Sequence, residues 1–311
     1  LMPLVNHDRM IAQTAEIRRR VALATLGNRL GNEDDLSSET VLLQIKSATD
    51  AHAAAKLIAP FTGNAIPSRA RARACRLIAS IDKAYPLPPA MLRAAGCRDR
   101  AALAHAPFRV VAESVARQVV LPDVPRPAVI HHDQAVWVTT PVRIDFAGGW
   151  SDTPPICTDI GGAVVNAAVT LNGQYPVQVI AKLNQSRLLR LTSIDLGTRI
   201  EIRTTGELLD FGDPTHWASL PKAATVLAGF GPRNPGQRLD RWLAQIGGGL
   251  DLTIFSALPK GSGLGTSSIL GAAVLACLGR VQGISHGQGE LISLTSVLEQ
   301  WMNTGGGWQD Q

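Results

Sequence analysis

The sequence predicts an α+β protein in which a mostly helical region precedes a mixed domain of strands and helices. Residues 1–120 are rich in Ala, Leu, Arg and Ile, whereas residues 129–311 alternate β-branched segments with helical ones. Three prolines lie between them, in residues 121–128, which we expect to form a linker. The length of 311 residues accommodates two domains of ordinary size.

In the first region we expect helices at Ser47–Ala59 and Ala70–Ile81, and prolines break the region into short helices. Arginines cluster in this helical sequence at Arg69, Arg71 and Arg73, where a solvated helix face is expected. The formal net charge is +5, but no nucleic-acid reader motif accompanies it. Nucleic acid is therefore not an expected partner.

The four cysteines are scattered and form no CxxC pair, which favours neither a zinc site nor a disulfide framework. A reducing, cytoplasmic setting is expected. No run of about 18 uninterrupted apolar residues occurs, so no membrane segment is expected. The chain begins at Leu1 rather than Met and stops at Gln311 in a glycine-rich segment, and we expect a fragment of a longer protein.

The second region shows the alternation and turn signals of an α+β domain. Strands are predicted at Val136–Thr140, Val142–Phe146, Val177–Lys182, Leu188–Ser193, Arg199–Arg203 and Leu250–Ser256. Helices are predicted at Leu220–Gly229, Ser267–Leu278 and Glu290–Met302.

A glycine-rich loop, PKGSGLGTSS at 259–268, lies between the last predicted strand and an apolar helix. Its three glycines let backbone N–H groups turn inward, and the helix N-terminus adds partial positive charge. The hydroxyls of residues 266–268 can bond phosphate oxygens or magnesium. The segment predicts an anion cradle, although a glycine-rich turn with a serine N-cap has the same local pattern. It is not a Walker A loop, because threonine rather than lysine follows Gly265.

Two further segments carry charged residues suited to sugar and phosphate chemistry. In PVRIDFAGGWSDTPP, at 141–155, a strand ends at a Gly-Gly turn, and Asp152 can accept bonds from two sugar hydroxyls. A strand ending in a turn capped by Asp152 is the alternative. Glu299 lies on a predicted helix, and Asp310 follows a run of three glycines. Two such acids can bind a cation and accept a hydroxyl proton, or be a solvated helix residue and a turn residue.

These three segments resemble the GHMP kinases. PKGSGLGTSS is similar to the ATP-phosphate motif of that superfamily, whereas RIDFAGGWSDTPP and LEQWMNTGGGWQDQ resemble its fucokinases in particular. The resemblance covers about residues 136–311. It implies a two-lobed α+β fold, of which residues 129–311 would be the N-terminal lobe, cut before the C-terminal lobe.

The resemblance also implies ATP and Mg²⁺ as cofactors and assigns roles to individual residues. The implied catalytic residues are Asp310, as the base, and Arg143. The implied metal ligands are Ser267 and Glu299. The implied sugar-binding residues are Gly149, Trp150 and Asp152. The implied ATP-binding residues are Lys260, Gly261, Ser262, Gly263, Leu264, Gly265, Thr266, Ser267 and Ser268.

The implied reaction is ATP-dependent phosphorylation of the anomeric hydroxyl of L-fucose. A heptose-phosphate kinase of the same superfamily is an alternative, since such kinases carry a related version of the superfamily's first motif, which RIDFAGGWSDTPP at residues 143–155 resembles. An inactive sugar- or nucleotide-binding module is another. Many fucokinases are fused to a GDP-fucose pyrophosphorylase domain, so residues 1–120 are expected to be the connector or tail of an upstream domain of that kind.

Overall fold

A computed structural model describes residues 68–84, 86–117, 119–153, 157, 161–259, 262 and 264–302. They divide into two compact units, the first with the helices up to Ser114 and the second with residues 115–153 and those from Gly162 onward. The mixture of helices and strands confirms the predicted α+β class. Within the described residues, no helix combines the length and the apolar character needed to cross a bilayer.

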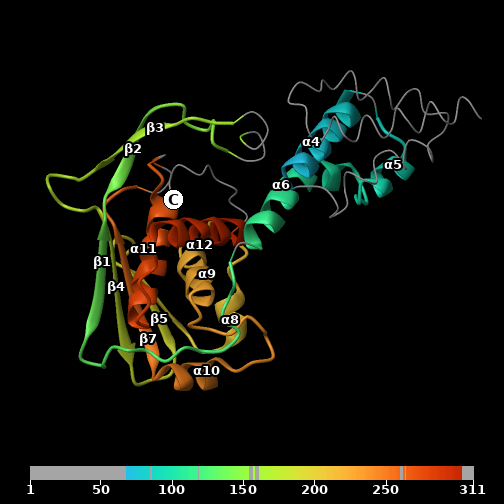
Figure 1. Ribbon diagram of the computed structural model, residues 1–311. Coiled ribbons are helices and arrows are strands. Elements are labelled where there is room, and N and C mark those ends of the chain that lie inside the picture. Colours follow the sequence, from blue (N-terminus) through green and yellow to red (C-terminus); the bar gives the residue numbers. More distant parts are fainter. Residues whose placement is uncertain are drawn as a thin grey trace, which may run out of the picture. The chain divides into compact units, whose positions relative to one another are not determined.

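In the described part of the first unit, the helices with assigned bounds are α4 (Ser68–Ala84), α5 (Pro89–Ala94) and α6 (Arg100–Ala116) (Figure 1). The helix predicted at Ala70–Ile81 is confirmed, whereas the one predicted at Ser47–Ala59 lies outside the described residues. The expected solvated arginine face is wrong for Arg71 and Arg73, which are 4% and 8% exposed. Arg71 Nη2 lies 3.1 Å from Glu113 Oε2, and this pairing compensates a charge that burial would otherwise disfavour.

The second unit is built on a sheet with the strand order β1–β4–β7–β5–β6, and only β5 and β7 are parallel neighbours. Its elements, in chain order, are β1 (Ala135–Thr140), β2 (Val142–Ala147), β3 (Val165–Val169), β4 (Val177–Asn184), β5 (Leu189–Ser193), β6 (Thr198–Ile202), α8 (Thr205–Leu209), α9 (Ser219–Leu227), α10 (Leu239–Ile246), β7 (Gly249–Ser256), α11 (Thr266–Val281) and α12 (Gln288–Trp301).

The core of the second unit lies between one face of this sheet and its helices. Side chains alternate along β4 and β7, so that every second residue is buried, as period-two strands require. Helix α11 packs on β1 and β4, and helices α9 and α12 pack on α11 (Figure 1). This arrangement fixes the start of α11 at the end of the central strand β7.

Strands β2 and β3 form a separate antiparallel pair, with a bulge between Asp145 and Ala147. Strand β3 was not predicted, and neither were α8 and α10. Helix α8 carries a sequence signal, a capping box in which Thr204 and Glu207 bond each other's backbone amides. Helix α10 ends at Gly247 with φ 111°, the glycine stop typical of helix C-termini.

The segment predicted as a linker lies along the second unit. The backbone amide of Ala128 donates to the carbonyl of Ile246 at 2.8 Å, and that of Val129 donates to the carbonyl of Val281 at 2.9 Å. At Gly229, a Cβ would meet Pro122 at 2.8 Å. Part of the proline-rich segment is thus bonded to the ends of α10 and α11.

Candidate functional site

The glycine loop leads from β7 directly into the N-terminus of α11. Gly265 is the N-cap and adopts φ 69°, in the left-handed region that glycine enters without steric cost. It offers no side chain to the first amides of the helix. Those amides can therefore donate to an anion placed at the helix end. Ser262, Leu264 and Gly265 are described here, whereas Lys260, Gly261 and Gly263 lie outside the described residues.

The first turn of α11 supplies three hydroxyls in different environments. Ser267 is exposed and Thr266 is half-buried, with its Oγ1 lying 3.5 Å from Ser262 Oγ. Ser268 is only 6% exposed, and its Oγ donates a hydrogen bond to Oε1 of Glu299. The structure therefore brings Glu299 of α12 to the first turn that follows the glycine loop. Sequence reasoning gave Ser268 only a place in the ATP loop and did not foresee its bond to Glu299.

Close packing of α11 and α12 explains how the two side chains meet. At Gly271, one turn after Ser268, a Cβ would lie 2.8 Å from Leu298 Cδ2. Leu298 is 1% exposed, so its side chain lies within the packed core. At the end of α12, the Trp301 ring stacks on Phe211, with centroids 6.0 Å apart and planes within 5°. Both contacts fix the turn of α12 that carries Glu299.

The first motif forms a tight loop that is held by residues just before β3. Ser151 Oγ donates to the carbonyl of Ala163 at 3.0 Å and accepts from its amide at 3.1 Å. A Cβ at Gly148 would lie 1.9 Å from the Ala163 carbonyl oxygen, so only glycine fits there. Trp150 adopts φ 71° and is 78% exposed. A bulky residue in this backbone region is strained, and such strain concentrates at functional sites.

Asp145 is a candidate binding residue that sequence reasoning missed. Its Oδ2 lies 2.0 Å from where a Cβ on Gly149 would be, so the glycine permits the carboxylate to approach the loop backbone. Asp145 Oδ1 and Thr153 Oγ1 are buried, and neither forms a hydrogen bond within the described part of the chain. Buried polar atoms are nearly always paired, so the missing partners make Asp145 and Thr153 candidates for contact with a ligand. The sequence signal was an acid beside the Gly-Gly pair.

Of the remaining predicted residues, the structure describes Arg143 and Asp152 but not Asp310. Arg143 lies on β2 opposite Ala168, and Asp152 lies in the loop after Trp150. Both side chains are half-buried, and both engage in polar interactions. Asp310 lies outside the described residues, so its role as the base stays a prediction.

The donor set at the start of α11 fits Mg²⁺. Glu299 supplies a carboxylate bonded to the Ser268 hydroxyl, Ser267 precedes Ser268 in the same helical turn, and all three side chains carry hard oxygen donors. Magnesium in nucleotide sites is commonly held by one or two carboxylates together with substrate phosphates. Among the described residues, no group of three or more His, Cys, Asp or Glu side chains could hold a metal by itself. The donors present match an ion that arrives with a phosphate ligand.

Helix α11 also carries Cys277, whose environment is unlike that of a nucleophile. Its Sγ lies 3.6 Å from the carbonyl oxygen of Val136 and 3.8 Å from that of Val179, inside the sheet–helix core. Burial raises the pKa of the thiol to about 12. Cys277 is therefore protonated at neutral pH and serves packing.

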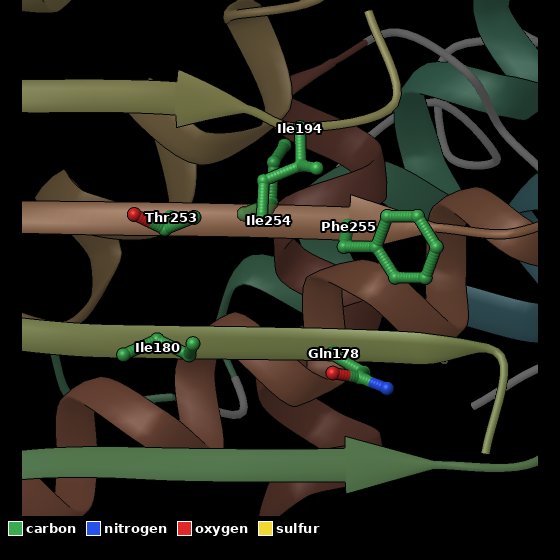
Figure 2. Close-up of a pocket in the computed structure, with 6 residues that line it drawn as sticks. All are labelled: Gln178, Ile180, Ile194, Thr253, Ile254 and Phe255. Atoms are coloured by element: carbon green, nitrogen blue, oxygen red, sulfur yellow. The ribbon is translucent and has the colours of Figure 1, made fainter. Parts of the chain in front are cut away.

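A hollow of about 200 Å³ opens on the five-stranded sheet, away from both motifs. Figure 2 shows its lining on β4, on β7 and just after β5, namely Gln178, Ile180, Ile194, Thr253, Ile254 and Phe255. The lining contains no ionisable side chain and no residue of the glycine loop. It is therefore not part of the candidate site.

Comparison with known proteins supports the motif assignments. Residues 237–311 match the GHMP kinases N terminal domain family. A Bacteroides fragilis protein named L-fucokinase/L-fucose-1-P guanylyltransferase is 45% identical over 185 residues, which cover 58% of this chain and 20% of that protein. An Arabidopsis thaliana protein named bifunctional fucokinase/GDP-fucose pyrophosphorylase is 37% identical over 177 residues, covering 56% and 16%. The predicted resemblance to GHMP kinases, and to fucokinases among them, is confirmed.

The chain spans a fifth or less of the length of these curated relatives. Among solved structures, a Lactococcus lactis galactokinase complexed with galactose has a TM-score of 0.43 at 20% identity, covering 65% of this chain and 44% of that one. The Methanococcus jannaschii mevalonate kinase has a TM-score of 0.43 at 14% identity, covering 58% and 50%.

The packing of the first-motif loop leads to a prediction for Gly162→Ala. The new Cβ would lie 2.2 Å from the Ser151 carbonyl oxygen, a backbone atom that cannot rotate away. Overpacking costs about 1–3 kcal/mol, so local opening of the loop should increase roughly 5- to 150-fold. We expect correspondingly faster hydrogen exchange at the Ala163 amide. Gly206→Ala in α8 is the matched control, because no atom lies within 4 Å of its Cβ position. Unchanged exchange in Gly162→Ala would contradict the packing described here.

Proposed function

We propose that the protein phosphorylates the anomeric hydroxyl of L-fucose with ATP and yields L-fucose 1-phosphate. The observation that carries the proposal is the hydrogen bond between Ser268 and Glu299. It joins an acid of α12 to the first turn of α11, which follows the glycine loop and carries three hydroxyls. A phosphate cradle beside a cation-binding acid is the arrangement that phosphoryl transfer needs. The choice of L-fucose is supported by the names of the two relatives.

ATP would bind with its phosphates at the N-terminus of α11. The backbone amides there, the Lys260 side chain and the hydroxyls of Thr266 and Ser267 are the proposed phosphate ligands. Ser267 and Glu299 would hold Mg²⁺, which neutralises phosphate charge when it is bound. The exposure of Ser267 supports this role, because its hydroxyl faces solvent, where the nucleotide enters.

The sugar would lie against the loop of the first motif. The exposed Trp150 ring offers an apolar surface for the carbon face of the sugar, and Asp152 can accept hydrogen bonds from neighbouring hydroxyls. Asp145, whose Oδ1 has no hydrogen-bond partner among the described residues, is proposed as a further acceptor for a sugar hydroxyl.

The proposed chemistry is a direct in-line transfer. The anomeric oxygen attacks the γ-phosphorus, a new P–O bond forms, and the bond to the leaving ADP oxygen breaks. Asp310 accepts the proton that the hydroxyl releases. Arg143 keeps Asp310 ionised or stabilises the charge on the transferring phosphoryl group. Positioning and charge stabilisation would supply most of the rate.

Fusion to a GDP-fucose pyrophosphorylase domain is the second part of the proposal. Both relatives have bifunctional names, and this chain covers a minor part of each. Residues 1–120 would then connect the two activities, both in the cytoplasm, with residues 129–311 forming the kinase part. We expect the upstream coding sequence to continue in frame into a nucleotidyltransferase domain, and a start codon a few residues before Leu1 would contradict this.

A substrate panel tests the proposed reaction. With ATP and Mg²⁺, the complete gene product is expected to turn over L-fucose at least about tenfold faster than D-mannoheptose phosphates, which is the discrimination that 1.4 kcal/mol provides. ADP release and the phosphorylated sugar are measured. Preference for a sugar that already bears a phosphate would replace the proposal with a heptose-phosphate kinase. Nucleotide binding without any transfer would indicate an inactive binding module.

Asp310→Asn tests the catalytic base. The amide cannot accept the hydroxyl proton, so turnover is expected to fall by roughly 10²–10⁴-fold. Sugar binding, measured by calorimetry, is expected to persist. Asp133→Asn is the control, since Asp133 is an exposed residue of the segment before β1. Wild-type turnover in Asp310→Asn would exclude the role given to that residue.

A further inference from the structure

We propose that Ser268 is a positioning residue that holds the Glu299 carboxylate in the orientation needed to bind the nucleotide-associated cation. The inference rests on the proposed function, in which Glu299 is a cation ligand. It gives Ser268 a task distinct from that of its neighbour Ser267, and from the phosphate contact expected from its place in the loop.

The contact between Ser268 and Glu299 has the features of a positioning bond. Ser268 Oγ donates to Glu299 Oε1 across 31 residues of sequence. A hydrogen bond to an ionised carboxylate is stronger than one between neutral groups. Glutamate has three rotatable side-chain bonds, whereas serine has one, and the buried Ser268 cannot swing into solvent. The serine therefore limits the positions that the glutamate can adopt.

Helix geometry separates the roles of the two adjacent serines. Successive residues of an α-helix point about 100° apart, since 3.6 residues make one turn. Ser267 is exposed at the end that the glycine loop enters, while Ser268 is buried and directed to α12. One hydroxyl can thus serve the ligand while the other supports the acid. Ligating carboxylates commonly receive such a supporting hydrogen bond.

The surrounding packing is rigid enough to give this bond a fixed geometry. The helices pack closely at Gly271 and Leu298, within one turn of Ser268 and next to Glu299. Thr295, one turn before Glu299, is fully buried, and its Oγ1 donates to the Leu291 carbonyl at 2.8 Å. A site on packed helices holds its ligands more precisely than one on loops. Loss of the Ser268 hydroxyl should therefore affect the acid and leave the helix pair in place.

The experiment compares Ser268→Ala with Ser268→Thr in the complete gene product. Mn²⁺ serves as the probe, and its binding is followed by electron paramagnetic resonance in the presence of a non-hydrolysable ATP analogue. Ser268→Ala is expected to weaken Mn²⁺ binding by roughly 10- to 100-fold, the usual effect of removing a support of a metal ligand. Ser268→Thr keeps the hydroxyl and is expected to restore most of the affinity.

Ser293→Ala is the matched control. Ser293 lies on α12, and its Oγ donates only within its own helix, to the Gly289 carbonyl at 2.9 Å. This variant removes the same hydroxyl from a helix without touching Glu299, and its Mn²⁺ affinity should equal that of the wild type. Mn²⁺ affinity that is unchanged in Ser268→Ala would overturn the proposal. The proposal would also be overturned if Ser268→Ala bound fewer Mn²⁺ ions per protein at unchanged affinity. That result would mean that part of the protein is unfolded and that the remaining sites do not need the Ser268 hydroxyl.

Glu299→Gln separates failure of this inference from failure of the proposed function. If Glu299→Gln weakens Mn²⁺ binding while Ser268→Ala does not, Glu299 remains a cation ligand and only the role of Ser268 is refuted. If Glu299→Gln binds Mn²⁺ like the wild type, Glu299 is not a cation ligand. The cation site of the proposed function is then refuted, and so is the positioning role of Ser268. Weakening in both variants, with rescue by Ser268→Thr, supports both.

Discussion

The close approach of α11 and α12 is the constraint on which the candidate site depends. Gly271 removes the side chain that would hold Leu298 away, so the two helices meet closely enough for a short serine to reach Glu299. Helix α11 is in turn fixed by its packing on β1 and β4. The sheet therefore sets the position of α11, and α11 sets the position of the acid.

A second constraint shapes the first motif, and it also rests on glycine. Gly148 and Gly162 let the loop and the segment before β3 touch through their backbones, and Ser151 closes the contact with two hydrogen bonds to Ala163. This packing holds Trp150 at φ 71° with its ring exposed to solvent. The strain and the exposure each carry an energetic cost, and both agree with a loop selected for binding rather than for stability.

Strong local patterns led to correct predictions, and weak ones led to errors. Alternating apolar residues located β1, β4, β5 and β7, because a half-buried strand needs this alternation. Strand β3, with the sequence VNAAV, has little of it and was missed. Arg71 was predicted to be solvated but is buried. The error arose because its partner Glu113 is far along the chain and no local sequence pattern indicates the pairing.

The sequence by itself determined the three motifs, their order and the residue types able to bind phosphate, a cation and a sugar. It did so because glycine spacing and helix starts act through the local backbone. Only the tertiary structure decided that Ser268 rather than Ser267 bonds to Glu299, and that Asp145 Oδ1 is buried with no hydrogen-bond partner among the described residues. Those facts depend on how α11 turns toward α12 and how β2 enters its loop. These side-chain contacts arise from packing between segments that are far apart in the sequence. The residues adjacent to each side chain do not encode that packing.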